Sequence, residues 1–208
     1  MKTIYKEFTI QNTIIGPITI VFYKQKDLLI KQIILSNSNF TSTEIAYAKY
    51  ERLSNCPLNL LNPYLKDLIN NIEKYLNGED IDFSLEYLDF SNLTEFQLEV
   101  LLYEYNTKRG TVNTYGQLAY MINRPKSYRA VGNVLSRNPF PIIIPCHRTV
   151  RKDWTIGGFN GNSYGDASKE ILLGLEGIEI KQKKIICESN IISLNKNLQT
   201  KLLALSKT

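Results

Sequence analysis

The sequence predicts a mixed α/β fold, in which the sheet and most of the helices lie in separate parts of the chain (α+β). Two observations predict it. Residues 1–90 contain β-branched apolar runs separated by short polar segments, as in a small sheet. Residues 91–188 instead contain repeated helix-start signals between loops. The change of pattern near residue 90 predicts two domains, at 1–90 and 91–188. They are followed by a tail at 189–208, whose spaced leucines indicate a short helix.

The first domain is expected to be a sheet with one helix across it. Two strand-like runs, 14–23 and 28–35, flank a polar segment that is typical of a hairpin. Residues 65–76 carry apolar side chains at helical spacing, after a proline and before a glycine. A polar connector is expected at 36–43, and the alternation at 83–85 is typical of a strand.

Two capping boxes mark helix starts in the second domain. Residues 94–97 and 114–117 each place a threonine three positions before a glutamine, at the start of an apolar pattern. A break at 123–126 precedes Ser127, which is expected to cap a third helix that ends near Arg137. The second and third helices therefore have the outline of a helix-turn-helix.

The third helix is basic on one side. Val131, Val134 and Leu135 are expected to be buried, which leaves Arg129 and Arg137 available to the opposite side. Positive side chains on a short helix suit a groove of DNA, where they replace condensed counterions. An ordinary αα-hairpin with solvated arginines has the same pattern, so the pattern alone leaves both interpretations open.

The composition excludes several classes of protein. Three widely spaced cysteines (Cys56, Cys146 and Cys187) and a single histidine argue against a disulfide framework and against a zinc site. The first residues lack the apolar core of a signal peptide, and no apolar run has membrane-spanning length, which predicts a cytoplasmic location. A net charge of +5 permits a polyanionic partner without requiring one.

The strongest chemical signal is the dipeptide Cys146–His147, because His147 is the only histidine in the chain. A free thiol with a pKa of roughly 8.5 is mostly protonated at neutral pH, so a reactive cysteine needs a base or a positive field. Pro141 and Pro145 bracket residues 142–144, which are expected to form a short buried strand that turns at Cys146. Taken alone, such a pair is more often a buried thiol beside a hydrogen-bonded core histidine.

Longer segments around this dipeptide resemble the O6-alkylguanine-DNA alkyltransferase family. They are residues 114–119, 128–132, 138–148 with a Pro-Cys-His-Arg tetrad, 156–159, 169–173 and 176–177. The resemblance covers residues 92–178. It implies a winged helix-turn-helix-like C-terminal domain behind a ribonuclease H-like N-terminal domain.

The resemblance also implies DNA repair by direct reversal, a single-turnover methyltransferase reaction. An alkyl group would pass from O6 of guanine to Cys146, and O4-alkylthymine is a candidate second substrate. His147 would remove the thiol proton through a water, and Glu176 would orient the imidazole. Tyr115 would donate to the charge that develops on the base, and Lys169 would support the thiol and the leaving group.

The implied partner is double-stranded DNA that carries O6-alkylguanine, bound by a monomer without cofactor, metal or membrane. A base must leave the stack to reach a buried thiol. Arg129 resembles the family's arginine finger, which fills the vacated place, and Asn138 resembles the family's hinge asparagine, which would brace the helix-turn-helix against the Cys146 segment. The expected DNA-contacting residues are Tyr115, Ser127, Tyr128, Arg129, Ala130 and Gly132.

A substrate pocket is expected around the segment that follows the cysteine, with the backbone of that segment reading the guanine edge. Phe159 stands where many family members have tyrosine, Asn160 where many have serine, and Thr149 where valine is common. The loop 161–165 is longer than in compact members. The expected pocket residues are Arg148, Val150, Trp154, Gly158, Phe159 and Asn160.

Two other classes remain open. A Cys-His-Glu constellation would equally serve a cysteine hydrolase, which would regenerate its thiol and turn over. A non-catalytic, alkyltransferase-like damage-binding module would lack the acceptor cysteine, whereas this chain has Cys146.

Overall fold

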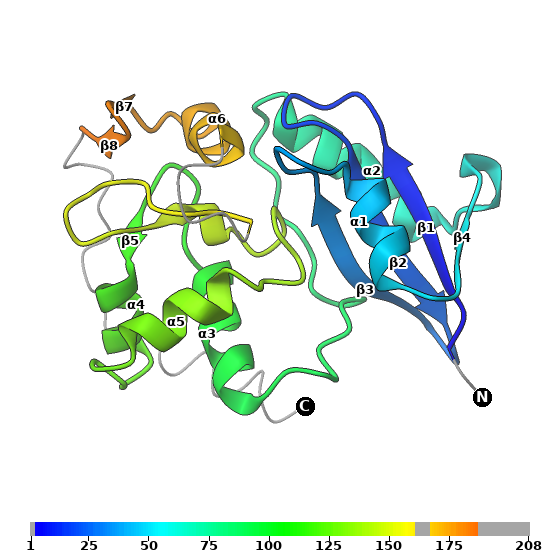
Figure 1. The fold of residues 1–208 in the computed structure, drawn as a ribbon, viewed down its shortest axis with the longest axis horizontal. Coiled ribbons are helices and arrows are strands. Elements are labelled where there is room, and N and C mark those ends of the chain that lie inside the picture. The colour runs from blue at the N-terminus through cyan, green and yellow to red at the C-terminus, as the bar shows by residue number, and fades with distance from the viewer. Residues whose placement is uncertain (1–2, 161–166, 187–208) are drawn as a thin grey trace. The chain divides into compact units, whose positions relative to one another are not determined.

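The chain divides into two compact units, shown as a ribbon in Figure 1. The computed structural model describes residues 3–160 and 167–186. The first unit contains residues 1–92 and 139–143, and the second contains 93–138 and 144–208. The predicted mixed α/β class is confirmed, with a sheet and helices in the first unit and mainly short helices in the second. Within the described ranges, no helix is both long enough and apolar enough to cross a membrane.

The first unit is built on a four-stranded sheet with the order β3-β2-β1-β4. β2 (Ile18–Lys24) pairs antiparallel with β3 (Leu28–Leu35), so the predicted hairpin is confirmed. On its other side β2 pairs antiparallel with β1 (Tyr5–Ile10), which in turn pairs parallel with the three-residue β4 (Leu53–Asn55). The sequence pattern indicated neither β1 nor β4, because β1 mixes charged and apolar residues and β4 is too short to show a period.

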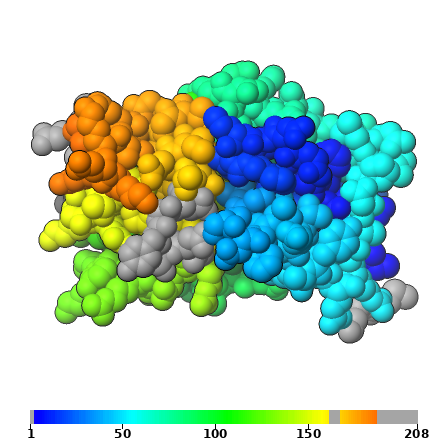
Figure 2. Space-filling model, turned by 45° about the horizontal axis from the view of Figure 1, so that its top comes forward, coloured from blue at the N-terminus to red at the C-terminus, as the bar shows by residue number. Residues whose placement is uncertain are grey.

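Two α-helices accompany this sheet. α1 (Ser42–Lys49) packs Ala46 against Val21 of β2 and Ile34 of β3. α2 (Pro63–Leu76) follows the short turn η1 (Leu58–Leu60), and the expected 65–76 helix is confirmed. In the space-filling view, the blue and cyan segments of this unit form a continuous surface (Figure 2). The buried residues of α2 are Leu65, Leu68, Ile69, Ile72, Tyr75 and Leu76.

One expectation was right only in part, and two were wrong. Residues 36–41 form the expected connector, but Ser42 and Thr43 belong to α1, which starts from a capping box between Thr41 and Glu44. Residues 83–85 form no strand, and the described pairing nearby is a single bridge between Ile30 and Leu88. Residues 142–144 are buried but lie in turns, since the flanking prolines lack the N–H groups that a strand would donate and Ile142 has a φ of 75°.

The second unit contains the expected series of short helices: α3 (Glu95–Tyr105), α4 (Tyr115–Met121) and α5 (Tyr128–Leu135). Both predicted capping boxes are present, at Thr94 and at Thr114. Ser127 occupies the N-cap position of α5, but the expected cap is wrong, because its hydroxyl donates to the Arg124 carbonyl at 2.7 Å. Val131, Val134 and Leu135 are buried as predicted.

Short strands connect the remaining parts of this unit. β5 (Asn113–Thr114) pairs parallel with β6 (Thr149–Val150), which directly follows the turn η2 (Cys146–Arg148). β7 (Ile180–Lys181) and β8 (Lys184–Ile185) form a hairpin after α6 (Ala167–Leu175). In Figure 2 the orange α6–β8 segment lies against the yellow loop after η2, and the backbone N–H of Ile156 donates to Lys183 there.

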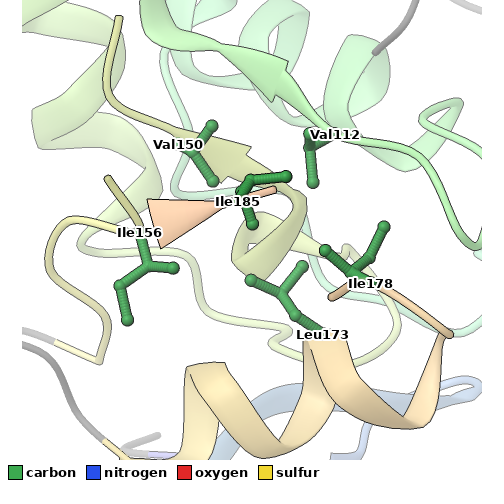
Figure 3. Close-up of a cluster of buried hydrophobic side chains, with 6 residues drawn as sticks. All are labelled: Val112, Val150, Ile156, Leu173, Ile178 and Ile185. Carbon is green, nitrogen blue, oxygen red and sulfur yellow. The ribbon is translucent and has the colours of Figure 1, made fainter. Parts of the chain in front are cut away.

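A cluster of aliphatic side chains joins these strands to α6 (Figure 3). Because β6 and α6 share this core, the segments on either side of them are held in fixed positions. The cluster consists of Val112, Val150, Ile156, Leu173, Ile178 and Ile185. The expected tail helix at 189–208 and the long loop at 161–165 lie outside the described residues.

Candidate active site

Cys146 lies on the wall of a cavity of about 490 Å³ in the second unit. The residue begins η2, and only 7% of its surface is exposed. Asn138 holds its position, since Nδ2 of Asn138 donates to Cys146 Sγ at 3.2 Å and to the Ile144 carbonyl at 2.8 Å. Burial raises the pKa of the Cys146 thiol to about 11, against the opposing effect of the Asn138 hydrogen bond. The resting thiol is therefore protonated, and a base is needed to ionise it.

The neighbouring His147 is fully buried and bonded to a carboxylate. Its Nε2 lies 3.0 Å from Oε1 of Glu176, which follows the last turn of α6. Burial lowers the pKa of His147, and the hydrogen bond and charge of Glu176 oppose that shift only in part. The imidazole is therefore neutral at neutral pH. An ionised carboxylate can only accept, so Nε2 carries the proton and Nδ1 is the basic nitrogen.

Arg148 keeps Glu176 ionised. Its Nε lies 2.9 Å from Oε2 of Glu176 and its Nη2 2.8 Å from Oε1, while Nη1 donates to the carbonyl of Thr107. Burial alone would raise the pKa of Glu176, but His147 and Arg148 outweigh it and hold that pKa well below its usual range. The side chain of Arg148, which was expected at the substrate pocket, thus points to the carboxylate instead.

Two further predicted residues flank the thiol. Lys169 of α6 is fully buried, and its Nζ donates to the backbone carbonyl of Thr149 at 2.6 Å. Burial lowers the pKa of Lys169 to about 8, although the charges of Cys146 and Glu104 act in the other direction. Tyr115, at the start of α4, lines the same cavity as Cys146, and burial raises its pKa to about 12. Its hydroxyl is therefore protonated and able to donate.

Glu104 of α3 is a site residue that the sequence reading missed. It is fully buried, and its Oε2 lies 2.6 Å from the hydroxyl of Thr149. Its Oε1 has no hydrogen-bond partner among the described residues. Burial raises the pKa of Glu104 to about 7. A signal was present in the sequence, because Glu104 is four residues after Val100 and three after Leu101, and it therefore lies on the same face of the helix as these two buried residues.

The cavity wall combines predicted and unpredicted residues. Of the expected pocket residues, Gly158 and Phe159 line it, whereas Val150 belongs to the aliphatic core and Trp154 packs against that core. The unpredicted part comes from α5 and the residues after it, and from Arg151 after β6. The lining residues are Tyr115, Gly132, Asn133, Leu135, Ser136, Arg137, Cys146, Arg151, Gly158 and Phe159.

The outer side of α5 is open to solvent. Tyr128, Arg129 and Ala130 are exposed, and the guanidinium carbon of Arg129 lies 5.8 Å from the centre of the Tyr128 ring. Gly132, one turn further along α5, lies beside Tyr115, whose ring a Cβ there would meet at 3.7 Å. One short helix therefore carries exposed Arg129 on one side and part of the cavity wall on another.

Comparison with known proteins identifies the family. The family model described as 6-O-methylguanine DNA methyltransferase, DNA binding domain, matches residues 95–178. The methylated-DNA–protein-cysteine methyltransferase of Methanosarcina mazei is 33% identical over 155 residues, which cover 72% of this chain and 92% of that protein. The chain belongs to the methylated-DNA–protein-cysteine methyltransferase family. The relative from Methanothermobacter thermautotrophicus is 39% identical over 56% of this chain, and the matched part spans 64% of that relative's length.

Solved structures of this methyltransferase family have the same fold. A crystal structure of the O6-methylguanine-DNA methyltransferase of Pyrococcus kodakaraensis matches with a TM-score of 0.61 and 26% identity, over 84% of this chain and 100% of that chain. A structure of Mycobacterium tuberculosis OGT in complex with DNA matches with a TM-score of 0.61 and 26% identity, over 83% and 91% of the two chains.

Proposed function

We propose that this protein repairs DNA by moving an alkyl group from O6 of guanine to Cys146, once per molecule. The observation that carries the proposal is the position of the thiol. It lies on the wall of a cavity, it is bonded to Asn138, and it is followed in sequence by a neutral imidazole that is paired with a carboxylate. O4-alkylthymine is the second candidate substrate.

The reaction requires a thiolate in a site that disfavours one. His147 accepts the thiol proton at Nδ1, through a water, and the Nε2–H bond to Glu176 stabilises the resulting imidazolium. The carboxylate of Glu176 remains ionised throughout, because Arg148 holds its other lone pairs. This arrangement provides the base that the high pKa of Cys146 demands.

Transfer is a displacement at saturated carbon. The sulfur–carbon bond forms while the carbon–O6 bond breaks, and the bonding electron pair moves onto the guanine. The Tyr115 hydroxyl donates to the negative charge that develops there, and the proton taken from the thiol neutralises the base. The product is a thioether on Cys146, which has no leaving group that water can displace, so the protein is consumed.

Binding to double-stranded DNA is proposed through α5. Its exposed Arg129 would enter the space that the displaced nucleotide leaves, and the nucleotide would occupy the cavity next to Cys146. The small side chains of Ala130 and Gly132 suit a minor groove of roughly 6 Å width. The protein is proposed to act as a monomer, in a compartment reducing enough to keep the Cys146 thiol free. The proposed domains are 1–90 and 91–188.

The test is an intact-mass measurement after incubation with a DNA duplex that contains O6-methylguanine. We expect a gain of one methylene per protein, located on the Cys146 peptide, and no transfer beyond one equivalent. An identical duplex with unmodified guanine is the control. A label on Cys56 instead, or release of product in repeated turnovers, would exclude the proposal.

A cysteine hydrolase is the competing function, and the same experiment separates the two. A hydrolase returns to its unmodified mass and continues to release product. The mass on Cys146 after the substrate is exhausted therefore decides between them.

A further inference from the structure

The carboxyl of Glu104 has no role in the transfer described above, although it is buried beside the residues that perform it. Glu104 is fully buried, and a buried carboxylate is costly unless a charge or a set of hydrogen bonds compensates it. One of its oxygens has no partner among the described residues. Such a group is expected to change protonation state more easily than a fully bonded one.

Thr149 connects this carboxyl to Lys169. The Thr149 hydroxyl lies 2.6 Å from Glu104 Oε2, and the Thr149 backbone carbonyl accepts from Lys169 Nζ at 2.6 Å. A valine at this position would keep the backbone carbonyl that accepts from Lys169 but would lack the hydroxyl that contacts Glu104. Thr149 directly follows η2, the turn that carries Cys146. The Glu104 carboxyl bonds to the hydroxyl of this residue and the Lys169 ammonium to its backbone carbonyl, so one residue next to the turn joins the two groups.

The hydrogen bonds among Glu104, Thr149 and Asn113 can be satisfied with Glu104 either protonated or ionised. The hydroxyl of Thr149 also lies 2.5 Å from Asn113 Oδ1, and a hydroxyl has one hydrogen for two acceptors. The amide of Asn113 is oriented by a 2.9 Å bond from its Nδ2 to Thr107. In this orientation every contact is satisfied if Glu104 is protonated and donates to Thr149, which then donates to Asn113.

Turning over the Asn113 amide satisfies the ionised state. Thr149 then donates to the Glu104 carboxylate, Nδ2 of Asn113 donates to Thr149, and the hydroxyl of Thr107 donates to Asn113. The same side chains therefore serve both protonation states of Glu104 without moving the backbone.

Among the described residues, the charged or titratable groups that act on Glu104 are Lys169 from α6, Arg148 and Cys146 from η2, and Tyr115 from α4. Lys169 and Arg148 favour the carboxylate, and a Cys146 thiolate would oppose it. Conversely, an ionised Glu104 opposes ionisation of Cys146.

We propose that Glu104 is a positioning residue that shares one negative charge with Cys146, opposite the ammonium of Lys169. The carboxyl holds the charge while the thiol is protonated, and it binds a proton when the thiol becomes a thiolate. The proton from the thiol leaves by way of His147, and the proton on Glu104 comes from solvent, so no other reactant is required. The inference rests on the proposed function only in taking the thiolate as the reactive form.

An ionised Glu104 disfavours the Cys146 thiolate, and a protonated Glu104 does not. Burial raises the pKa of Glu104 to about 7, so the carboxyl is protonated in mildly acidic solution and ionised in mildly basic solution. Replacing Glu104 by glutamine mimics the protonated form in size and in its ability to donate to Thr149. Glu104→Gln should therefore favour the thiolate only at pH values where the natural carboxyl is ionised.

The test measures the reaction of Cys146 with iodoacetamide, by mass of the Cys146 peptide, between about pH 5.5 and about pH 8. Glu104→Gln should react about threefold to tenfold faster than the unchanged protein at the basic end, and at the same rate at the acidic end. Thr149→Val removes the hydroxyl that donates to the Glu104 carboxylate, which should raise the pKa of Glu104. The inflection in the plot of Cys146 reaction rate against pH should therefore move to higher pH. Glu99→Gln, on the same helix but in a half-exposed pair with Arg124, is the matched control and should leave the profile unchanged.

Two results would overturn the inference. One is a ratio of the Glu104→Gln rate to the rate of the unsubstituted protein that does not vary with pH. The other is a slower reaction of Glu104→Gln at every pH. Because iodoacetamide requires no DNA, failure of alkyl transfer from O6-methylguanine would refute the proposed function without affecting this result. A folded Glu104→Gln protein, checked by thermal unfolding, makes either outcome decisive.

Discussion

The substitution Glu176→Gln separates the orienting role of Glu176 from its structural role. Hydrogen-bond donors from the described residues surround the carboxylate: Nε2 of His147 at 3.0 Å, Nε and Nη2 of Arg148, and the backbone N–H of Gly110 at 3.4 Å. A glutamine amide replaces one acceptor oxygen with an NH₂ group, which would face one of these donors. The variant therefore loses a charge and also gains a donor-to-donor conflict.

The expected magnitudes follow from burial. Glu176 and His147 have fully buried side chains, and Arg148 is 11% exposed, so Arg148 would keep a poorly solvated charge without its partner. Breaking such a pair from one side costs about 3 kcal/mol of unfolding free energy. Replacing a charge-assisted bond to the imidazolium by a neutral one costs about 1.4 kcal/mol, which corresponds to about a tenfold slower alkylation of Cys146.

The assay combines chemical unfolding with single-turnover methyl transfer from duplex DNA, with rates compared at a temperature where the variant remains folded. Because the pKa of Glu176 is lowered in the folded state, its stabilising effect is complete above about pH 5 and declines as pH falls further. The difference in stability should therefore shrink in acid. Glu179→Gln, which breaks only the exposed pair with Lys181, should change stability by less than about 0.5 kcal/mol. A folded Glu176→Gln protein that transfers methyl at the unchanged rate would remove Glu176 from the mechanism.

Three further substitutions test other parts of the site. Cys146→Ala should abolish transfer and leave duplex affinity intact, as measured by fluorescence anisotropy; equal loss of affinity would make the cysteine structural. Arg129→Ala should slow repair of duplex DNA far more than reaction with free O6-benzylguanine, and equal losses would contradict a role in base displacement. Asn138→Ala removes the 3.2 Å bond to the thiol, so Cys146 should react about threefold to tenfold more slowly with iodoacetamide at neutral pH, and an unchanged rate would show that the bond has no effect on ionisation.

The sequence predicted those parts of the fold that local patterns determine. The two capping boxes, the β2–β3 hairpin and the periodic face of α2 are properties of neighbouring residues. Strands β1 and β4 have no such local signal, because β4 has three residues and is stabilised by pairing with a strand far away in the chain. The isoleucine run at 142–144 matched a strand in hydrophobicity, but the prolines beside it direct the backbone into turns.

In the site, too, some features could be predicted from the sequence, whereas others depend on tertiary contacts. The resemblance led to the prediction that Cys146, His147 and Glu176 are neighbours, and the structure places Nε2 of His147 3.0 Å from Oε1 of Glu176. It did not indicate that Arg148 would turn away from the cavity, because its attraction to a carboxylate 28 positions later is a tertiary effect. Glu104 was missed for a related reason, since a charged residue inside a helix is ordinarily assigned to the solvent face.

The pairing of β5 with β6 has a consequence for how the protein tolerates change. This two-residue parallel ladder places Thr114, immediately before Tyr115, opposite Val150, which comes shortly after Cys146. The hydrogen bonds of the ladder are made by the main chain, which substitutions at these positions leave in place. The spacing between proton donor and nucleophile can therefore survive extensive mutation of the flanking side chains, whereas a one-residue deletion between Cys146 and Val150 would shift the register and misalign the two reacting groups.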